Sequence, residues 1–273
     1  MKSMIKFSRL CAGLVVLAAS TFAVTAQQVT PPTKLVESGK LTYGTAATFR
    51  PFEYMVDGKL TGFDIEFGAH LAGLLGLEVN PMPMDFGGLI PALKSGRMDI
   101  INSAMYIKPE RAEQVDFVPY MRVGNEIIVK KGNPHKVGSR DDLCGLKVAV
   151  TLGGIQESYA REDSAKCTDA GKGAVTVMTF PTAQDSALSV KSGRADAFYN
   201  STPGATVQVA ELPDDYEIVG KTFAANTQIG FAIRKGDAEM RAAIEKALAI
   251  AVKDGTYAKL IEKYGLPSSV SLF

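Results

Sequence analysis

The chain has 273 residues, of which 46% are hydrophobic and 22% are charged. This ordinary globular composition excludes disordered, collagen-like and low-complexity proteins. The formal net charge of +1 lacks the basic excess with which proteins neutralise nucleic-acid phosphates, so no nucleic-acid partner is expected. His70 and His135 lie far apart and the three cysteines do not cluster, so the sequence predicts no metal site and no other cofactor.

Residues 1–26 have the three parts of a secretory signal peptide. Basic residues precede an apolar stretch at 10–24, and small residues at 24–26 precede the expected cleavage before Gln27. A membrane anchor would need about 20 apolar residues, which favours cleavage and export instead. Cys11 lies within the signal and not at the end of its apolar run, so a soluble exported protein is expected and not a lipoprotein.

Cleavage leaves Cys144 and Cys167 as the two cysteines of the exported chain. An even pair of cysteines in an oxidising compartment usually forms a disulfide. The sequence therefore predicts this bond, and two buried free thiols are the alternative.

β-Branched and aromatic runs alternate with helical patterns along the rest of the chain, which predicts a layered α/β protein. Taken in chain order, the predicted strands are 41–44, 77–82, 100–103, 126–130, 146–151, 175–180 and 228–233. The predicted helices are 64–75, 88–94, 109–114, 156–161, 183–191, 238–252 and 257–263. The helix at 64–75 has Asp64 as its expected N-cap and Gly76 as its expected end.

The sequence KSGRMD at 94–99 recurs as KSGRAD at 191–196, and each copy ends a predicted helix at glycine and begins a strand. The strand starts at 41–44 and 146–149 have a similar offset. These echoes predict two halves of similar βαβ construction, each about 100 residues long. Coincidental reuse of one helix end within a single sheet is the alternative.

The sequence contains none of the strong enzyme motifs, namely G-x-G-x-x-G after a strand, a G-K-[ST] phosphate loop, H-E-x-x-H and G-x-S-x-G. Instead, groups that suit a small organic ion gather at the ends of predicted strands, where open α/β sheets bind ligands. Binding is therefore favoured over catalysis, and no catalytic residue is expected.

Arg111 is the most informative single residue. Pro109 predicts the first turn of a helix at this point, where a cation opposes the helix dipole. A guanidinium in this position suits a ligand carboxylate that it binds together with backbone N–H groups. The alternative is a solvated Arg111 paired with Glu110 or Glu113.

Two further features are consistent with a ligand cleft. The segment 153–156, with the sequence GGIQ, links a strand to a helix start and leaves N–H groups free for an anion. Phe49, Phe52 and Phe86 lie in turn-rich segments, where they could line a ligand site, although core packing is the ordinary role for each of them.

Three segments carry a family resemblance: TFRPFEY at 48–54, GKLTGFDIEF at 58–67 and GGLIPALKSGRMDIINSAMYIKPERAEQVDF at 87–117. With these segments, the chain resembles the bacterial extracellular solute-binding proteins of family 3, the periplasmic polar amino-acid receptors of ABC importers. The similarity covers essentially the whole exported chain, through DGTYAKLIEKYGL at 254–266.

The resemblance implies a type II periplasmic-binding-protein fold, in which two lobes, each a mostly parallel sheet flanked by helices, are joined by a two-strand hinge. Lobe 1 would comprise 36–124 plus 227–273, and lobe 2 would comprise 125–226. A small ligand, an amino acid or related carboxylate, would bind between the lobes, and an inner-membrane ABC permease would recognise the closed form. The resemblance also implies a monomer in the periplasm.

Matched position by position, the resemblance makes Arg111 the carboxylate clamp and makes Phe49 and Phe86 the aromatic residues that stack on the ligand. The remaining residues of the expected ligand site are Phe52, Ser103, Ala104, Met105, Tyr106, Gly154, Ile155, Gln156, Asn200 and Ser201.

Two positions depart from the family pattern. Asn200 and Ser201 occupy the stretch where an Asp of lobe 2 usually meets the ligand ammonium, and Ala46 replaces an acid that is common in the first loop. A buried ammonium without a carboxylate partner is unfavourable. We therefore expect a small carboxylate with an apolar or aromatic body, either a modified amino acid or a non-amino organic acid.

A carboxyl group in the cleft would change this expectation. An ordinary α-amino acid is the close alternative ligand, with Glu53, Glu157 or Asp185 supplying the negative charge. The alternative function is that of a cyclohexadienyl-dehydratase-like periplasmic enzyme, which would need Asp185 or Glu157 as a general acid. A fused sensory or cell-wall-cleaving module is not expected, because the chain ends at Phe273.

Overall fold

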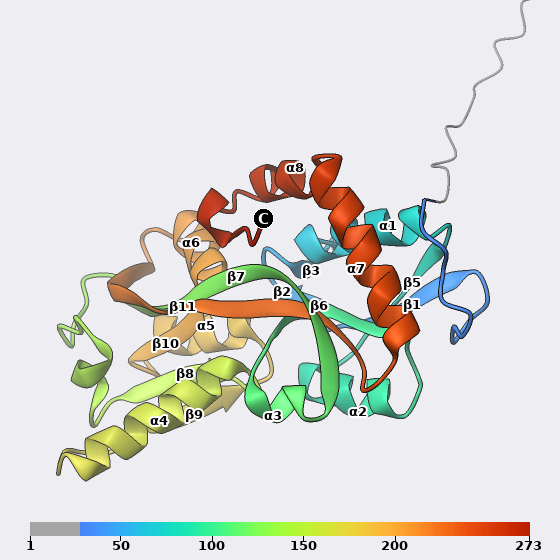
Figure 1. The fold of residues 1–273 in the computed structure, drawn as a ribbon. Coiled ribbons are helices and arrows are strands. Elements are labelled where there is room, and N and C mark those ends of the chain that lie inside the picture. Colours follow the sequence, from blue (N-terminus) through green and yellow to red (C-terminus); the bar gives the residue numbers. More distant parts are fainter. Residues whose placement is uncertain (1–27) are drawn as a thin grey trace, which may run out of the picture.

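One eight-stranded sheet organises the part of the chain described by the computed structural model, residues 28–273 (Figure 1). The predicted signal peptide lies outside the described residues. In spatial order, the strands are β5 (Glu78–Pro83), β1 (Lys40–Thr45), β6 (Ile100–Tyr106), β11 (Tyr216–Arg234), β7 (Val115–Lys130), β10 (Ala197–Ser201), β8 (Lys147–Thr151) and β9 (Thr176–Phe180). A separate three-stranded sheet consists of β2 (Thr48–Phe49), β3 (Glu53–Val56) and β4 (Lys59–Thr61).

Helices cover both faces of the large sheet (Figure 1). The α-helices are α1 (Phe63–Leu74), α2 (Leu89–Lys94), α3 (Pro109–Ala112), α4 (Ile155–Asp169), α5 (Ala183–Lys191), α6 (Thr202–Glu211), α7 (Ala238–Lys253) and α8 (Thr256–Lys263). Short 3-10 helices are η1 (Phe86–Gly88), η2 (Arg140–Leu143) and η3 (Ser268–Val270). The predicted mixed α/β fold is confirmed. Within residues 28–273, no helix combines the length and the apolar character that crossing a membrane requires.

Each end of the sheet has hydrophobic cores on both of its faces. We call β1–β6 with α1–α3, α7 and α8 the first half, and β8–β10 with α4–α6 the second half. In the first half, Phe67 of α1 belongs to the core on one face and Leu89 of α2 to the core on the other. In the second half, Val148 and Phe198 belong to the cores on opposite faces. Two packed units therefore share one continuous sheet.

The long antiparallel strands β7 and β11 connect the two halves and cross the centre of Figure 1. They contain 16 and 19 residues, and their pairing becomes irregular between Val219 and Thr227, where the chain passes from one half to the other. The sequence pattern predicted only 126–130 and 228–233 as strands, because residues such as Pro119 interrupt the apolar runs. The other predicted strands, and most helices, are present with boundaries shifted by a few residues.

The two copies of the sequence repeat occupy equivalent places in the two halves. Asp99, after α2, accepts hydrogen bonds from the backbone N–H groups of Thr42 (2.8 Å) and Val36 (2.9 Å). Asp196, after α5, accepts one from the backbone N–H of Lys147 (2.8 Å). The glycine of each copy adopts a left-handed conformation, with φ of 76° and 73°. Each copy thus ends a helix and fixes the start of the neighbouring parallel strand, β1 or β8.

The start of α1 differs from the prediction. Its N-cap is Gly62, with φ of 127°, and a Cβ atom there would clash with the carbonyl oxygen of Phe52. The expectation of Asp64 as the N-cap is therefore wrong. Asp64 lies within the first turn and points into the protein, where it accepts hydrogen bonds from the backbone N–H of Ala104 (2.6 Å) and from Tyr120 Oη (2.7 Å).

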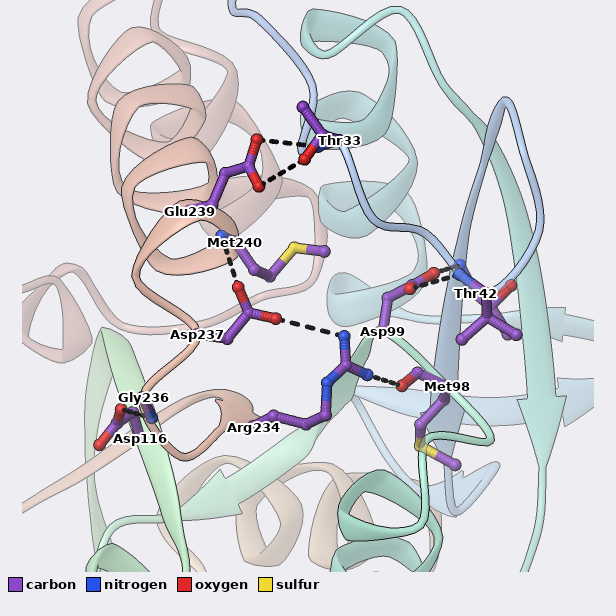
Figure 2. Close-up of polar contacts among 11 residues, drawn as sticks. Thr33, Thr42, Met98, Asp99, Asp116, Arg234, Gly236, Asp237, Glu239 and Met240 are labelled. Atoms are coloured by element: carbon purple, nitrogen blue, oxygen red, sulfur yellow. Dashed lines mark hydrogen bonds and ion pairs between the residues drawn. The ribbon is translucent and has the colours of Figure 1, made fainter.

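The helix α7 is anchored to the sheet by a polar network at its N-terminus (Figure 2). Asp237 caps the helix and forms an ion pair with Arg234 (3.2 Å). Arg234 also donates a hydrogen bond to the carbonyl of Met98 (2.6 Å), beside Asp99. Glu239 accepts two hydrogen bonds from Thr33, both of 2.8 Å. This network joins the N-terminal segment, the repeat and the C-terminal helices of the first half.

In the second half, α4 continues beyond the predicted helix at 156–161 to Asp169. Its buried face includes Asp163 and Cys167, and an acid in the buried face hides the helical period. The predicted disulfide between Cys144 and Cys167 is present, with the Cα atoms 5.5 Å apart. The helix α6 was not predicted, because Pro and Gly near its start and its β-branched residues have low helix propensity.

Candidate ligand-binding site

A cavity lies between the two halves, with about 510 Å³ of unfilled space when the open solvent at its mouth is included. The first half contributes Ala46, Thr48, Phe49, Glu53, Phe86, Ala104 and Tyr106. The second half contributes Thr151, Gly154, Ile155, Gln156, Ala183, Tyr199 and Asn200. A molecule in this cavity would therefore contact both halves at once.

Most of the residues predicted for a ligand site line this cavity. They are Phe49, Phe86, Ala104, Tyr106, Gly154, Ile155, Gln156 and Asn200. They come from β2, η1, the ends of β6 and β10, and the start of α4. This is the position in open α/β sheets where parallel strands end and ligands bind.

Four other predicted residues do not line the cavity. Phe52 and Met105 are buried in the hydrophobic cores of the first half. Ser103 and Ser201 hydrogen-bond within the protein, Ser103 to Glu53 and Ser201 as the N-cap of α6. These side chains support neighbouring wall residues instead of facing the cavity.

Arg111 lies beside the cavity and lines the groove adjoining it, with Phe86 common to both. The predicted helix start is correct, since α3 begins with a proline at its first position. The guanidinium lies 5.1 Å from the centre of the Phe86 ring. It donates hydrogen bonds to the carbonyl of Tyr106 (2.7 Å) and, across to the second half, to the carbonyl of Gly153 (2.8 Å).

Arg111 forms no salt bridge among residues 28–273, and the charge of Glu110 acts on it only from a distance. Arg111 is 5% exposed, and its hydrogen bonds go to neutral carbonyl oxygens. The alternative of a solvated side chain paired with Glu110 or Glu113 is therefore wrong. Burial lowers the pKa of Arg111 to about 10, because desolvation penalises the charged form. An anion placed here would relieve that penalty.

Glu53 is the acidic residue of the cavity wall, and its role was foreseen only as an alternative source of charge. It is fully buried, and its Oε1 accepts a hydrogen bond from Ser103 Oγ (2.8 Å). Its Oε2 has no hydrogen-bond partner among the described residues. Burial, together with the nearby charge of Asp64, raises the pKa of Glu53 well above its usual range.

Two wall residues of the second half form hydrogen bonds with side chains that do not line the cavity. Gln156 donates from Nε2 to Oδ1 of Asn125 on β7 (2.8 Å). Tyr199, which the sequence analysis did not identify, donates from Oη to Asp163 (2.6 Å). Tyr199 comes directly before Asn200 on β10, and its position after the second repeat is the signal that could have revealed it.

The two halves also touch around the cavity. Lys108 Nζ donates a hydrogen bond to Ser158 Oγ (3.2 Å), and Arg50 lies 3.6 Å from a carboxylate oxygen of Glu211. With the contact between Arg111 and the second half, these pairs link the halves near the cavity. In the part of the chain that the structure describes, no cluster of three His, Cys, Asp or Glu side chains could hold a metal ion.

Comparisons with known proteins agree with this architecture. The L-cystine-binding protein TcyJ of Escherichia coli K12 is 34% identical over 233 residues, covering 85% of this chain and 84% of that protein. An ancestral arginine-binding protein has been solved bound to arginine (42% identity, TM-score 0.77) and to glutamine (41%, TM-score 0.76). The two matches include 98% of each solved chain and 83% and 84% of this chain, respectively.

An ancestral amino acid-binding protein described as a precursor of cyclohexadienyl dehydratase is 40% identical, with a TM-score of 0.74. The match covers 83% of this chain and 95% of that one. The sequence model of the bacterial extracellular solute-binding proteins, family 3, matches residues 41–267, which is most of the chain. This chain belongs to family 3 of the bacterial extracellular solute-binding proteins.

Proposed function

We propose that this protein is the substrate-binding component of an ABC importer and that its ligand is an amino acid. The observation that carries this proposal is the unpaired, buried Arg111 beside a cavity shared by two halves. A ligand carboxylate would supply the missing negative charge. The relatives support the ligand class, because their names and bound ligands are cystine, arginine and glutamine.

The position of Glu53 favours an ordinary amino acid over a non-amino organic acid. The substitutions at Asn200 and Ser201 had suggested that the cleft lacks a partner for a cation. Glu53 lines the cavity and forms no salt bridge among the described residues, so its carboxyl group can supply that partner. Phe49 and Phe86 would then enclose the body of the ligand between the charged ends.

The two halves would act as the lobes of the receptor, with 36–124 plus 227–273 forming lobe 1 and 125–226 forming lobe 2. The irregular pairing between Val219 and Thr227 supports a hinge at the predicted crossings. In this proposal the protein is a periplasmic monomer that is exported through its signal peptide. Its closed form would be recognised by the inner-membrane permease.

Catalysis by a dehydratase-like mechanism is less well supported. Neither acid predicted for that role lines the cavity. Glu157 accepts hydrogen bonds from the backbone N–H of Gly153 (2.8 Å) and from Arg161 (2.9 Å). Asp185 accepts one from Thr182 Oγ1 (2.8 Å) at the start of α5. Both carboxylates already have local partners, so binding without chemistry is the better reading of this site.

A thermal-unfolding screen of the exported chain tests the proposal directly. The panel contains the common amino acids, cystine, their des-amino analogues and small organic acids. A ligand present at 100 times its dissociation constant should stabilise the folded protein by about 2.7 kcal/mol. Stabilisation by an amino acid, confirmed by calorimetry, supports the proposal. Stabilisation by organic acids alone, or turnover of a cyclohexadienyl acid, would contradict it.

A further inference from the structure

A buried ion pair lies behind the cavity wall of the second half, with Asp163 of α4 at its centre. Asp163 is 4% exposed. Arg140 of η2 contacts both carboxylate oxygens of Asp163, from Nε at 2.8 Å and from Nη2 at 2.7 Å. Tyr199 donates its hydrogen bond to the same carboxylate. Asp163 therefore fixes Tyr199, which lines the cavity, relative to Arg140, which does not.

The disulfide joins the same two segments as this ion pair. Cys144 directly follows η2, and Cys167 lies one turn beyond Asp163 on α4. The backbone that carries Arg140 is thus attached to α4 covalently as well as by charge. Arg140 can therefore hold a fixed position between α4 and whatever packs on the other side of its guanidinium.

The other contact of Arg140 is with the crossing between the halves. Its guanidinium lies 4.7 Å from the centre of the Phe223 ring. Phe223 pairs with Asn125 between two register shifts of β7 and β11, where the chain passes from one half to the other. The ring of Phe223 also lies 5.0 Å from that of Tyr199. Such cation–π and aromatic contacts have preferred geometries, so Arg140 and Tyr199 both restrict the position of Phe223.

The partner of Phe223 in this crossing also contacts the cavity wall. Asn125 Oδ1 accepts the hydrogen bond from Gln156 Nε2. Gln156 and Tyr199 both line the cavity. Each member of the Phe223–Asn125 pair therefore touches a different wall residue of the second half. A change in the angle between the halves at this pair would disturb the wall that a ligand contacts.

We propose that Arg140 is a positioning residue for ligand binding, which holds Tyr199 in the cavity wall and Phe223 in the crossing as one unit. We call Arg140, Asp163, Tyr199 and Phe223 the Arg140 cluster. A ligand against this wall leaves when the crossing bends, and the Arg140 cluster opposes that bending. The inference rests on the proposed function, and it assigns to Arg140 a slow rate of ligand release.

The kinetics of ligand exchange test this role. Arginine, glutamine and cystine are passed over the immobilised exported chain, and surface plasmon resonance measures association and dissociation rate constants for each one that binds. Arg140→Gln should raise the dissociation rate constant about tenfold or more. Its association rate constant should stay within about twofold, because capture of the ligand precedes the step that the Arg140 cluster stabilises.

The matched control is Ser164→Ala on the same helix. Ser164 Oγ donates a hydrogen bond to the carbonyl of Val175 (2.9 Å), which lies outside the Arg140 cluster. This variant loses a contact between α4 and its neighbours, as Arg140→Gln does, but both of its rate constants should match those of the unmodified protein.

The conservative variant Arg140→Lys separates positioning from stability. Lysine keeps a positive partner for Asp163 but lacks the planar group that packs on Phe223. Its unfolding temperature should therefore lie closer to that of the unmodified protein than that of Arg140→Gln does, while ligand release stays fast. Recovery of both properties together would mean that the ion pair has a structural role alone.

A double-mutant cycle tests whether Arg140 acts through Phe223. Phe223→Leu keeps an apolar side chain in the crossing and should also speed ligand release. If the two residues act through one contact, the double variant should release ligand more slowly than the product of the two single effects predicts. Fully multiplicative effects would show independent roles and overturn the inference.

Hydrogen exchange of the ligand-free protein tests the same connection without a ligand. Tyr199→Phe removes the O–H that binds Asp163 and keeps the ring. This variant and Arg140→Gln should both speed amide exchange in residues 216–228, whereas Ser164→Ala should not. Unchanged exchange there, or unchanged ligand release in Arg140→Gln, overturns the inference. If none of the three amino acids binds, the proposed function fails, and the exchange rates alone decide whether Arg140 fixes the crossing.

Discussion

Buried charged side chains usually pair with a side chain of opposite charge, yet neither Arg111 nor Glu53 forms such a pair among residues 28–273. The fold thus keeps a cation and an acid in place around one cavity without letting them neutralise each other. A ligand with complementary charges could satisfy both. The selectivity of the site therefore depends on how firmly the structure fixes the positions of these two side chains.

The geometry of the guanidinium is the first testable feature. Replacing Arg111 with Lys keeps the positive charge but removes the planar fork that can bind a carboxylate while it contacts Gly153. Ligand affinity should fall by about 2 kcal/mol or more, while the unfolding temperature of the ligand-free protein changes little. Calorimetry with the identified ligand measures the first quantity and thermal unfolding the second. Unchanged affinity would remove Arg111 from the site.

The buried acid pair of Glu53 and Asp64 should also shape the pH dependence of stability. The pKa of Asp64 is about 6 in the folded protein, above the 3.8 of an ordinary Asp, so folding strengthens proton binding. This contribution to stability is present at low pH and is lost as pH rises from about 4 to 6, by up to 1.4 kcal/mol per pH unit. Urea unfolding measures the free energy of unfolding of the ligand-free protein across this range. This free energy should fall more steeply with pH in the unmodified protein than in the Glu53→Gln variant. Equal slopes in the two proteins would show that Glu53 takes no part in this proton binding.

Sequence reasoning identified most of the cavity wall, because the resemblance assigns the strand ends and the GGIQ loop by position. It gave Glu53 a minor role, since an acid at the start of a short hairpin strand resembles any exposed turn residue. Asp64 was expected at a helix cap for a similar reason. Tertiary packing buries both acids: α1 places Asp64 against β6 and β7, and Ser103 of β6 contacts Glu53.

At the scale of elements, the repeat around Asp99 and Asp196 shows one short sequence performing the same task twice. In each half, an aspartate follows a helix-ending glycine and binds the backbone of the adjacent parallel strand. The two copies therefore make the same kind of backbone contact. The long strands β7 and β11 could not be predicted at full length, because cross-strand pairing, and not their own apolar pattern, keeps their polar central residues extended.

The two aspartates should differ in their effect on stability. Asp99 is 0% exposed and accepts two backbone hydrogen bonds, so Asp99→Ala should cost about 3 kcal/mol or more. The Asp196 side chain is 22% exposed and accepts one backbone hydrogen bond beside His135, so Asp196→Ala should cost about 1–2 kcal/mol. Chemical denaturation of both variants measures the difference. If Asp196→Ala lost more stability than Asp99→Ala, burial of the aspartate would not determine its contribution to stability.

At the scale of the whole molecule, two units are packed on either side of a cavity and joined through β7 and β11. A ligand that contacts both units favours the arrangement in which both reach it. Lys108 contacts Ser158 and Arg50 contacts Glu211 across the two halves. Contacts of this kind form when the two halves lie close together.

Small-angle X-ray scattering measures whether the two halves come together when the ligand binds. In the proposed receptor, saturating ligand should reduce the radius of gyration, because the ligand-free protein spends time with the halves apart. The Arg111→Lys variant at the same ligand concentration should show a smaller change that grows as more ligand is added. A radius of gyration that is identical with and without bound ligand would mean that closure plays no part in recognition.

The order of the strands also has a consequence for how the chain folds. In the first half, β11 lies between β6 and β7, although it is the last strand of the chain. The sheet of the first half therefore lacks an inner strand until residues 216–234 have been synthesised. The segment 125–226, in contrast, contains β8, β9 and β10 in one continuous stretch. During synthesis, the second half can form local contacts early, while the first half must wait for a distant segment, which makes its completion the slower, long-range step of folding.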